Sequence, residues 1–230
     1  MSKKITAIIP ARGGSKGISG KNIKLLNGYP LIAYSIRSCK LSKNINRIIV
    51  STENKEIASI AKEYGAEVPF IRPKKHSTDE STDEGFLNHF FDKIKVEEVA
   101  LIRPTTPLRN PKIMDKAINL YFQKKEKISG LRSVETTSKT PYKLFQIIDG
   151  YCCGFFEDFK GIKDYANLPR QSFPKTYNAN GHIDIVKKET LKKGTIFGNK
   201  IFAYINPPII DIDSIQDFEY AEYQLKSQKQ

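Results

Sequence analysis

The chain of 230 residues has few cysteines and no long apolar run. Its three cysteines, Cys39, Cys152 and Cys153, are odd in number and lack the spacing of a metal site or a disulfide framework. No apolar stretch approaches the roughly 20 residues that span a bilayer. An apolar strand pattern begins almost at the N-terminus, which leaves no room for a signal peptide. These absences predict a soluble protein of a reducing compartment, most simply the cytoplasm.

Basic residues are abundant but dispersed. Lysine and arginine total 38 against 25 acidic residues, a formal net charge of +13. So basic a chain favours anionic partners, among them nucleic acid. The lysines nevertheless form only short pairs such as Lys3-Lys4, without the aromatic interleaving of single-strand binders. We therefore expect no nucleic-acid or membrane partner, and a minority of the cations serving a small anionic substrate.

Strand and helix patterns alternate through the first half of the chain. Short apolar runs predict strands, and apolar residues at helical spacing predict the helices between them. Such alternation with short connections indicates an α/β fold, a mostly parallel sheet flanked by helices. The expected strands span 5–9, 47–51, 67–71 and 99–102, and the expected helices 30–40, 54–64, 81–94 and 111–123.

The alternation stops near Ser129. Residues 131–175 are rich in Thr, Ser, Gly, Pro and aromatics and lack a helical period, which predicts an extended or hairpin excursion. Returning strands are expected over 181–186 and 201–205, and a last helix over 214–226. The length suits one domain with an elaboration, and no internal repeat is present. A single domain over residues 1–230 is therefore predicted.

The segment after the first strand is the most informative part of the chain. It sets glycines among cations: Gly13, Gly14, Gly17 and Gly20 with Arg12, Lys16 and Lys21. Glycines allow positive φ and bring N–H groups close to an anion, while the cations neutralise a polyphosphate. The pattern predicts a triphosphate cradle at the carboxyl end of the first strand, where open α/β sheets bind ligands. A flexible basic turn is the alternative.

Two familiar phosphate loops do not match this segment. A Walker A loop requires Gly-Lys-Ser/Thr, whereas Gly20-Lys21 is followed by Asn22, and Ser15 stands where the first glycine is needed. The glycine spacing does not supply the Gly-x-Gly-x-x-Gly of dinucleotide-binding folds either. The loop therefore belongs to another class of phosphate site.

The segment resembles the N-terminal signature of the CMP-sugar synthetases, cytidylyltransferases that activate sialic acid and related nonulosonic acids. In that family an Ala-Arg-x-x-Ser-Lys-Gly segment followed by Lys-Asn holds CTP, and the matching residues are Ala11, Arg12, Ser15, Lys16, Gly17, Lys21 and Asn22. The resemblance implies the Rossmann-like fold of nucleotide-diphospho-sugar transferases. It also implies a homodimer, in which an excursion, here residues 131–177, reaches over the partner subunit and supplies part of its active site.

Residues 210–213 read Ile-Asp-Ile-Asp, the second part of the expected site. If they form a strand, alternation places Asp211 and Asp213 on one face. Two carboxylates on one face suit Mg²⁺, which also takes phosphate oxygens and is needed for nucleotidyl transfer. The resemblance adds that this motif is the family's metal site. The alternatives are a surface strand position for Asp211 and a helix N-cap for Asp213.

A third segment, from Arg72 to Asp83, resembles the part of the family that reads cytosine. Arg72, Ser81 and Asp83 stand on the matching positions, and arginine is a suitable donor to pyrimidine acceptors. For Asp79 alone, an acidic turn capping the next helix is an equally good interpretation. The predicted nucleotide site thus comprises Ala11, Arg12, Gly13, Ser15, Lys16, Lys21, Asn22, Arg72, Ser81 and Asp83.

Residues 101–109 resemble the family's loop after the fourth strand, with one departure. Arg103 replaces a glutamine that contacts the acyl sugar, and a guanidinium reads carboxylate or phosphate rather than acting as a neutral amide. Arg109 is interpreted as a salt-bridged arginine that pins the loop, and His182 as structural. By resemblance, the acceptor-binding residues are Arg103, Lys143, Arg170 and Asn180.

Together these motifs predict transfer of CMP from CTP to the anomeric hydroxyl of a nonulosonic acid. Arg12, Lys21 and Asp211 are the expected catalytic residues, with Mg²⁺ on Asp211 and Asp213. An alternative is the same transfer to a KDO-like acid or to a phosphorylated small molecule, which Arg103 would suit. A silent basic binding module is a further alternative, disfavoured because Lys21 and both aspartates are retained.

Overall fold

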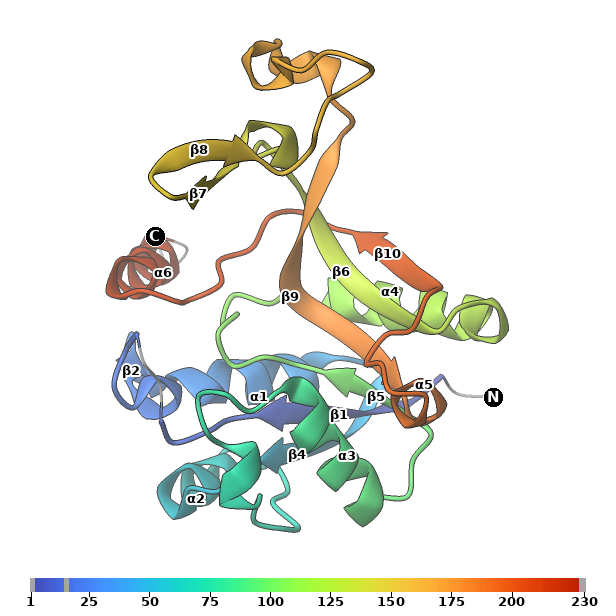
Figure 1. The fold of residues 1–230 in the computed structure, drawn as a ribbon. Coiled ribbons are helices and arrows are strands. Elements are labelled where there is room, and N and C mark those ends of the chain that lie inside the picture. The colour runs from blue at the N-terminus through green and yellow to red at the C-terminus, as the bar shows by residue number, and fades with distance from the viewer. Residues whose placement is uncertain (1–2, 15–16, 228–230) are drawn as a thin grey trace.

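A six-stranded mixed sheet forms the centre of the molecule (Figure 1). The computed structural model describes residues 3–14 and 17–227. The sheet order is β10-β6-β9-β5-β1-β4, from β1 (Ile5–Pro10), β4 (Ile45–Ser51), β5 (Glu98–Leu101), β6 (Gly130–Thr137), β9 (Thr176–Lys187) and β10 (Ile201–Ile205). β1 is parallel to β4 and β5, and β10 to β6, whereas β9 runs antiparallel to β5 and β6. The predicted mostly parallel sheet is confirmed.

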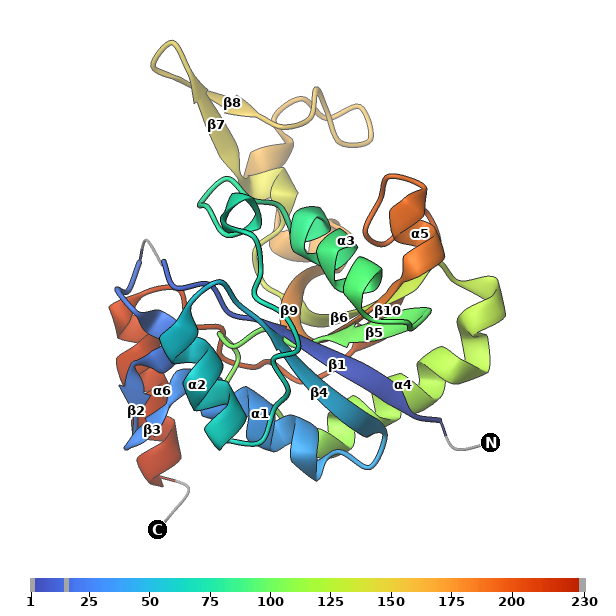
Figure 2. The ribbon, with the colours of Figure 1, turned by 90° about the horizontal axis from the view of Figure 1, so that it is seen from below.

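Helices cover both faces of this sheet (Figure 2). The helices are α1 (Leu31–Leu41), α2 (Lys55–Glu63), α3 (Asp83–Lys93), α4 (Pro111–Lys124), α5 (Lys188–Lys192) and α6 (Ile215–Ser227), of which the first five pack on the sheet. Alternation along β1 separates two layers of core, because successive side chains of a strand point to opposite faces. Ala7 and Ile9 pack with α1, α2 and α4, whereas Ile8 packs with α3 and α5.

Local sequence signals define the helix ends. The Asn54 side chain accepts hydrogen bonds from the N–H groups of Glu56 and Ile57, at 2.8 and 3.0 Å, and so caps α2. Gly65, with φ of 86°, follows the C-terminus of that helix. Asn110 caps α4 through the N–H of Lys112, and proline occupies its first turn. These ends agree with the predicted helices to within one or two residues.

The predicted strand over 67–71 is wrong. Only Glu67 forms a bridge, to Ile49, through hydrogen bonds with the flanking residues of β4. Pro69, two residues further on, has no N–H and cannot continue a parallel ladder. The segment instead runs on toward Arg72, whose N–H donates to the carbonyl of Thr52.

The predicted excursion of 131–177 begins inside the sheet, because its first residues form β6, which pairs with β9. Residues 138–175, here called the arm, project away from the sheet (Figure 1). The arm contains the hairpin β7 (Phe145–Ile148) and β8 (Tyr151–Gly154), turned at Asp149 and Gly150, both with positive φ. A small aromatic core around Tyr142 supports it, with Phe156 and Phe173 at ring-centroid distances of 4.6 and 5.0 Å.

Short elements complete the described chain. They are β2 (Leu25–Leu26), β3 (Tyr29–Pro30) and the 3₁₀ turns Lys21–Ile23, Lys74–His76, Lys125–Lys127, Pro141–Lys143, Tyr165–Asn167 and Arg170–Ser172. α6 packs beside β2, where Phe218 and Ala221 join Leu26 in a third apolar cluster. None of the helices in the described ranges is long and apolar enough to cross a membrane.

Candidate functional site

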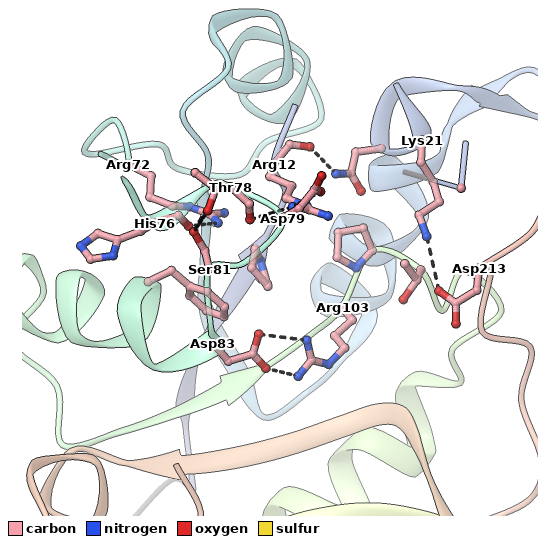
Figure 3. Close-up of a pocket in the computed structure, with 16 residues that line it drawn as sticks. Arg12, Lys21, Arg72, His76, Thr78, Asp79, Ser81, Asp83, Arg103 and Asp213 are labelled. Carbon is pink, nitrogen blue, oxygen red and sulfur yellow. Dashed lines mark hydrogen bonds and ion pairs between the residues drawn. The ribbon is translucent and has the colours of Figure 1, made fainter. Parts of the chain in front are cut away.

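A cavity of about 430 Å³ opens beside the carboxyl ends of β1 and β5 (Figure 3). Parallel strands of an α/β sheet commonly place ligands at this edge. Four segments form its wall: the loop after β1, the loop from Arg72 into α3, the loop after β5, and the approach to α6. Residues from the predicted site that line it are Arg12, Lys21, Asn22, Arg72, Ser81, Asp83, Arg103 and Asp213, and Gly17 of the glycine loop lines it as well.

Two of the predicted phosphate cations reach into this cavity from opposite ends of the glycine loop. The Arg12 guanidinium donates to the carbonyl of Thr78 and pairs with Asp79, both at 2.8 Å. The Lys21 ammonium donates to the carbonyl of Ile212 at 2.6 Å and lies 3.5 Å from Asp213. Both cations therefore hold neighbouring segments of the wall together, and both remain at its surface (Figure 3).

The glycine loop is fastened by side chains on either side. Gly13 donates its N–H to the Glu53 carboxylate at 2.6 Å, so that donor is already used. Asn22 donates from its amide to the carbonyl of Arg12 at 2.8 Å. Gly17 approaches the C-terminal segment so closely that an added Cβ would lie 2.4 Å from the carbonyl oxygen of Asp213. Glycine is therefore required there by close approach of two backbones.

Two other predicted residues of this loop do not line the cavity. Ala11 is buried in the core and donates its N–H to the carbonyl of Ser51, and Gly13 is bonded to Glu53. Ser15 and Lys16 lie outside the described residues. Glu53, which positions Gly13, has no motif around it that sequence reasoning could have used.

Arg72 builds the loop opposite the glycines. Its buried guanidinium donates to the Ser51 hydroxyl and carbonyl and to the carbonyl of His76. It also lies over the ring of Phe86, with 5.2 Å to the centroid. Burial lowers the pKa of Arg72 to about 10, so it stays charged at neutral pH. Ser81 ties the same loop internally, since its hydroxyl donates to the carbonyl of Lys75.

Arg103 and Asp83 form an ion pair across the cavity (Figure 3). One guanidinium nitrogen, Nη1, lies 3.4 Å from Oδ1, and Nη2 bonds to Oδ2. Burial is the largest effect on the pKa of Arg103 and acts to lower it, but the hydrogen bonds to Asp83 and the charges of nearby carboxylates together outweigh it, and the pKa is raised. The carboxylate predicted to read cytosine is thus engaged with the arginine predicted to read the acceptor.

The Ile-Asp-Ile-Asp segment is not a strand, which corrects the sequence prediction. Its alternation survives, because Ile212 is fully buried between two exposed aspartates and donates its N–H to the carbonyl of Thr105 at 2.8 Å. Asp213 faces the cavity with a side chain 83% exposed, whereas Asp211 does not line it. Among the described residues, no three metal-ligating side chains gather as one group.

Asp213 does not cap α6. That role belongs to Ser214, whose hydroxyl accepts the N–H of Asp217, while the Asp217 carboxylate accepts the N–H groups of Asp213 and Ser214. This reciprocal arrangement is a capping box. The Asp213 carboxylate is consequently directed at Lys21 and the cavity rather than at the helix end (Figure 3).

The other predicted acceptor residues lie away from this cavity. Lys143 and Arg170 stand on the arm, where each donates to a backbone carbonyl of the arm, Ala166 and Ser138 respectively. Asn180 is buried in β9 and donates to the Glu135 carboxylate at 3.2 Å. Within one chain, therefore, the structure does not bring these three residues to the cavity.

Arg109 pins the loop after β5, as predicted, but through hydrogen bonds rather than through a salt bridge in the described structure. It donates to the Ser35 hydroxyl and to the carbonyls of Arg103, Gly181 and His182, at 2.5–3.0 Å. Burial lowers the pKa of Arg109 to about 10. His182 is also buried, and its Nε2 accepts the N–H of Asn110.

Sequence reasoning undervalued Asp79. From the sequence it could be part of the cytosine-reading segment or an acidic turn, and nothing there pointed to its partner Arg12, which is 67 positions away in the chain. In the structure it is a lining residue that pairs with the first cation of the glycine loop. Contact across that separation has no local sequence signal.

The chain resembles known proteins over most of its length. The sequence model described as cytidylyltransferase matches residues 6–150. An N-acylneuraminate cytidylyltransferase of Escherichia coli O18:K1:H7 (strain RS218 / NMEC) is 36% identical over 225 residues, 96% of this chain and 52% of the relative. The chain thus spans about half of that relative. The post-translational flagellin modification protein B of Campylobacter coli is 31% identical, covering 96% of this chain and 95% of the relative.

Solved structures share the fold. A CMP:2-keto-3-deoxy-manno-octonic acid synthetase complexed with CTP superimposes with a TM-score of 0.75, at 12% identity, over 98% of this chain and 99% of that one. A 4-diphosphocytidyl-2C-methyl-D-erythritol synthase from Anaerococcus prevotii gives 0.64 at 16% identity, over 97% and 99%. The sequence match and the full-length relative carry the assignment: the chain belongs to the cytidylyltransferase family.

Proposed function

We propose that this protein transfers CMP from CTP to the anomeric hydroxyl of a nonulosonic acid. The hydroxyl oxygen attacks the α-phosphorus, the bond to the bridging oxygen breaks, and pyrophosphate leaves as the hydroxyl proton is released. The observation that carries the proposal is the cavity at the carboxyl end of β1, with Arg12 and Lys21 on its wall. Relatives named N-acylneuraminate cytidylyltransferase and CMP-N,N'-diacetyllegionaminic acid synthase support this substrate class.

The residues of the cavity suit an anionic nucleotide. Arg12 and Lys21 spread the charge of the triphosphate, and their contacts to Asp79 and Asp213 position them before the ligand arrives. Asn22 fixes the carbonyl of Arg12, which sets the path of the backbone behind the phosphates. Arg72 donates its hydrogen bonds to other residues of the protein and so holds the opposite loop in place. It would contribute to binding of the cytosine base by shaping that loop.

The aspartates before α6 fit a magnesium ion. Mg²⁺ is held by one or two carboxylates together with phosphate oxygens and water, and Asp213 offers an exposed carboxylate beside Lys21. Asp211 is exposed on the same segment but does not line the cavity, and its role as second ligand rests on the sequence motif. When bound, the ion would stabilise charge on the phosphates. The Asp213 carboxylate would then bind the ion in place of its contact with Lys21.

We further propose that the protein is a homodimer joined through the arm. The arm exposes a cluster of large apolar side chains, Leu144, Phe145, Ile147, Ile148, Tyr151, Phe155, Phe156 and Ile162. An exposed apolar surface of this kind favours burial against another protein, and a second copy of the chain offers the same surface. In such a dimer, Lys143 and Arg170 would serve the partner's cavity, since they do not reach their own.

Subunit complementation tests the shared site. Lys21→Ala and Arg170→Ala subunits are each expected to be nearly inactive alone. If Arg170 serves the partner's cavity, every mixed dimer contains one intact site, and an equimolar mixture recovers about a quarter of wild-type activity. A mixture as inactive as its components contradicts the exchange. Ile147→Glu, at a residue 67% exposed, should in addition convert the dimer to monomer in light scattering.

Pyrophosphate release tests the reaction itself. Wild-type protein is incubated with CTP, Mg²⁺ and each of several acceptors: a sialic acid, a pseudaminic or legionaminic acid, a KDO-type acid and a sugar phosphate. Omission of the acceptor, and replacement of CTP by ATP, are the controls. Release only with nonulosonic acids supports the proposal. Turnover of the KDO-type acid or the sugar phosphate alone establishes the alternative, and CTP binding without turnover establishes a binding module.

A further inference from the structure

The Arg103–Asp83 pair removes net charge from the cavity wall after β5. The two side chains are 30% and 29% exposed, and both line the cavity. Asp184 and Asp211 also act electrostatically on Arg103, so its surroundings are more acidic than one partner alone would make them. The sequence marks the Arg103 guanidinium as a group that binds anions, but in the fold carboxylates balance its positive charge.

This pair is built to persist when ligands bind. It has two hydrogen bonds between groups that are each about 70% covered, and Asp83 sits in the first turn of α3. The Lys21–Asp213 contact differs, since it is a single 3.5 Å approach to a carboxylate 83% exposed. A paired, partly desolvated bidentate contact is the stronger of the two. An entering ligand would displace Asp213 from Lys21 more readily than Asp83 from Arg103.

An intact pair presents two kinds of hydrogen-bonding atoms side by side. A guanidinium has five N–H donors, of which Asp83 uses two, and a carboxylate has about four acceptor positions. A phosphate or carboxylate could use the donors of Arg103 but would be repelled by Asp83. A hydroxyl carries its donor and acceptors on one oxygen atom, so it reaches less of the pair. A secondary amide offers one N–H and one carbonyl oxygen, complementary to both members of the pair.

We propose that Arg103 and Asp83 together read an acylamido substituent of the acceptor and disfavour a phosphorylated acceptor. This inference rests on the proposed function, and it places Asp83 on the acceptor side of the cavity rather than against cytosine. A sugar phosphate was an alternative acceptor because of the positive charge of Arg103, and the pairing with Asp83 balances that charge. The pair becomes a specificity determinant within the same site.

The test compares three acceptors that differ at one carbon of the sugar acid, bearing an acetamido, a hydroxyl or a phosphate group. The variants are Asp83→Asn, which removes the charge at nearly constant volume, Asp83→Glu, which keeps it, and Arg103→Gln. Glu84→Gln is the matched control, because it removes one charge from an exposed neighbour in the same helical turn. Pyrophosphate release gives kcat/KM, calorimetry gives CTP affinity without acceptor, and thermal melting verifies folding.

Wild type, Asp83→Glu and Glu84→Gln should prefer the acetamido acid at least tenfold over the other two. In Asp83→Asn the unbalanced guanidinium should raise the relative rate with the phosphate acceptor at least tenfold, while CTP affinity changes less than threefold. Arg103→Gln should lose preference for acetamido over hydroxyl. An unchanged ranking in Asp83→Asn, or a loss confined to CTP binding, overturns the inference alone. Wild type that turns over none of the acids overturns the proposed function with it.

Discussion

Replacing Lys21 with alanine should separate a catalytic role from a structural one. Its ammonium makes two contacts, to the carbonyl of Ile212 and toward Asp213, and its side chain is only 13% exposed. A hydrogen bond between a charged group and phosphate is worth about 1.5–3 kcal/mol. Because a phosphate cation acts in both the ground and transition states, KM for CTP should rise and kcat should fall, lowering kcat/KM roughly 10- to 160-fold.

The same substitution removes a hydrogen bond that joins the glycine loop to the segment before α6. That loss should reduce stability by about 1 kcal/mol, which lowers Tm by about 2–4 °C in a domain of this size. Lys24→Ala is the matched control: it removes an equal charge three residues along, from an exposed lysine above the Phe218 ring and outside the cavity. Steady-state pyrophosphate release with CTP varied gives the constants, and calorimetry gives Tm.

A kcat/KM for Lys21→Ala within twofold of that for Lys24→Ala refutes the assignment of Lys21 to the phosphates. The glycine loop would then be a turn that fastens the C-terminal segment. A drop in Tm without any change in kinetics would lead to the same conclusion.

Three further outcomes are expected. Asp213→Asn and Asp211→Asn should each lower turnover more than tenfold, with the greater loss at Asp213, which lines the cavity, and should weaken Mg²⁺-dependent CTP binding in calorimetry; activity within about tenfold, roughly 1.4 kcal/mol of barrier, contradicts the metal site. Arg109→Met should reduce the free energy of unfolding by about 3–5 kcal/mol in urea, because it leaves buried carbonyls without donors; a loss below 1 kcal/mol, on the same reasoning, means that it does not pin the loop. Burial raises the pKa of Asp184 to about 6, so its contribution to the free energy of unfolding is complete below about pH 4 and is lost as pH rises through 6. Burial lowers the pKa of His182 to about 3, so its contribution changes with pH in the opposite direction. Asp184→Asn should therefore make stability rise more steeply from pH 4 to 6 in urea titrations, and an unchanged slope contradicts this account.

Local sequence determined the elements of this protein to a large extent. Apolar periodicity predicted the helices, because this signal acts within a few turns. The structure adds the caps Asn54 and Asn110 at the starts of two of them. The same pattern predicted the parallel sheet, and the glycines after β1 predicted a ligand site at its carboxyl edge. The sequence prediction was wrong in two short segments. The single bridge at Glu67 and the irregular Ile-Asp-Ile-Asp segment both depend on residues that are distant in the chain.

Only the tertiary structure decided which side chains meet. Arg12 pairs with Asp79 and Arg103 with Asp83 across tens of residues, and Lys21 reaches the segment before α6 from 191 residues away. Ion pairs depend on distance in space, and periodicity carries no information about such distances. For that reason the sequence marked Arg103 as a free positive charge, whereas the fold pairs it with Asp83 and brings the charges of Asp184 and Asp211 to bear on it.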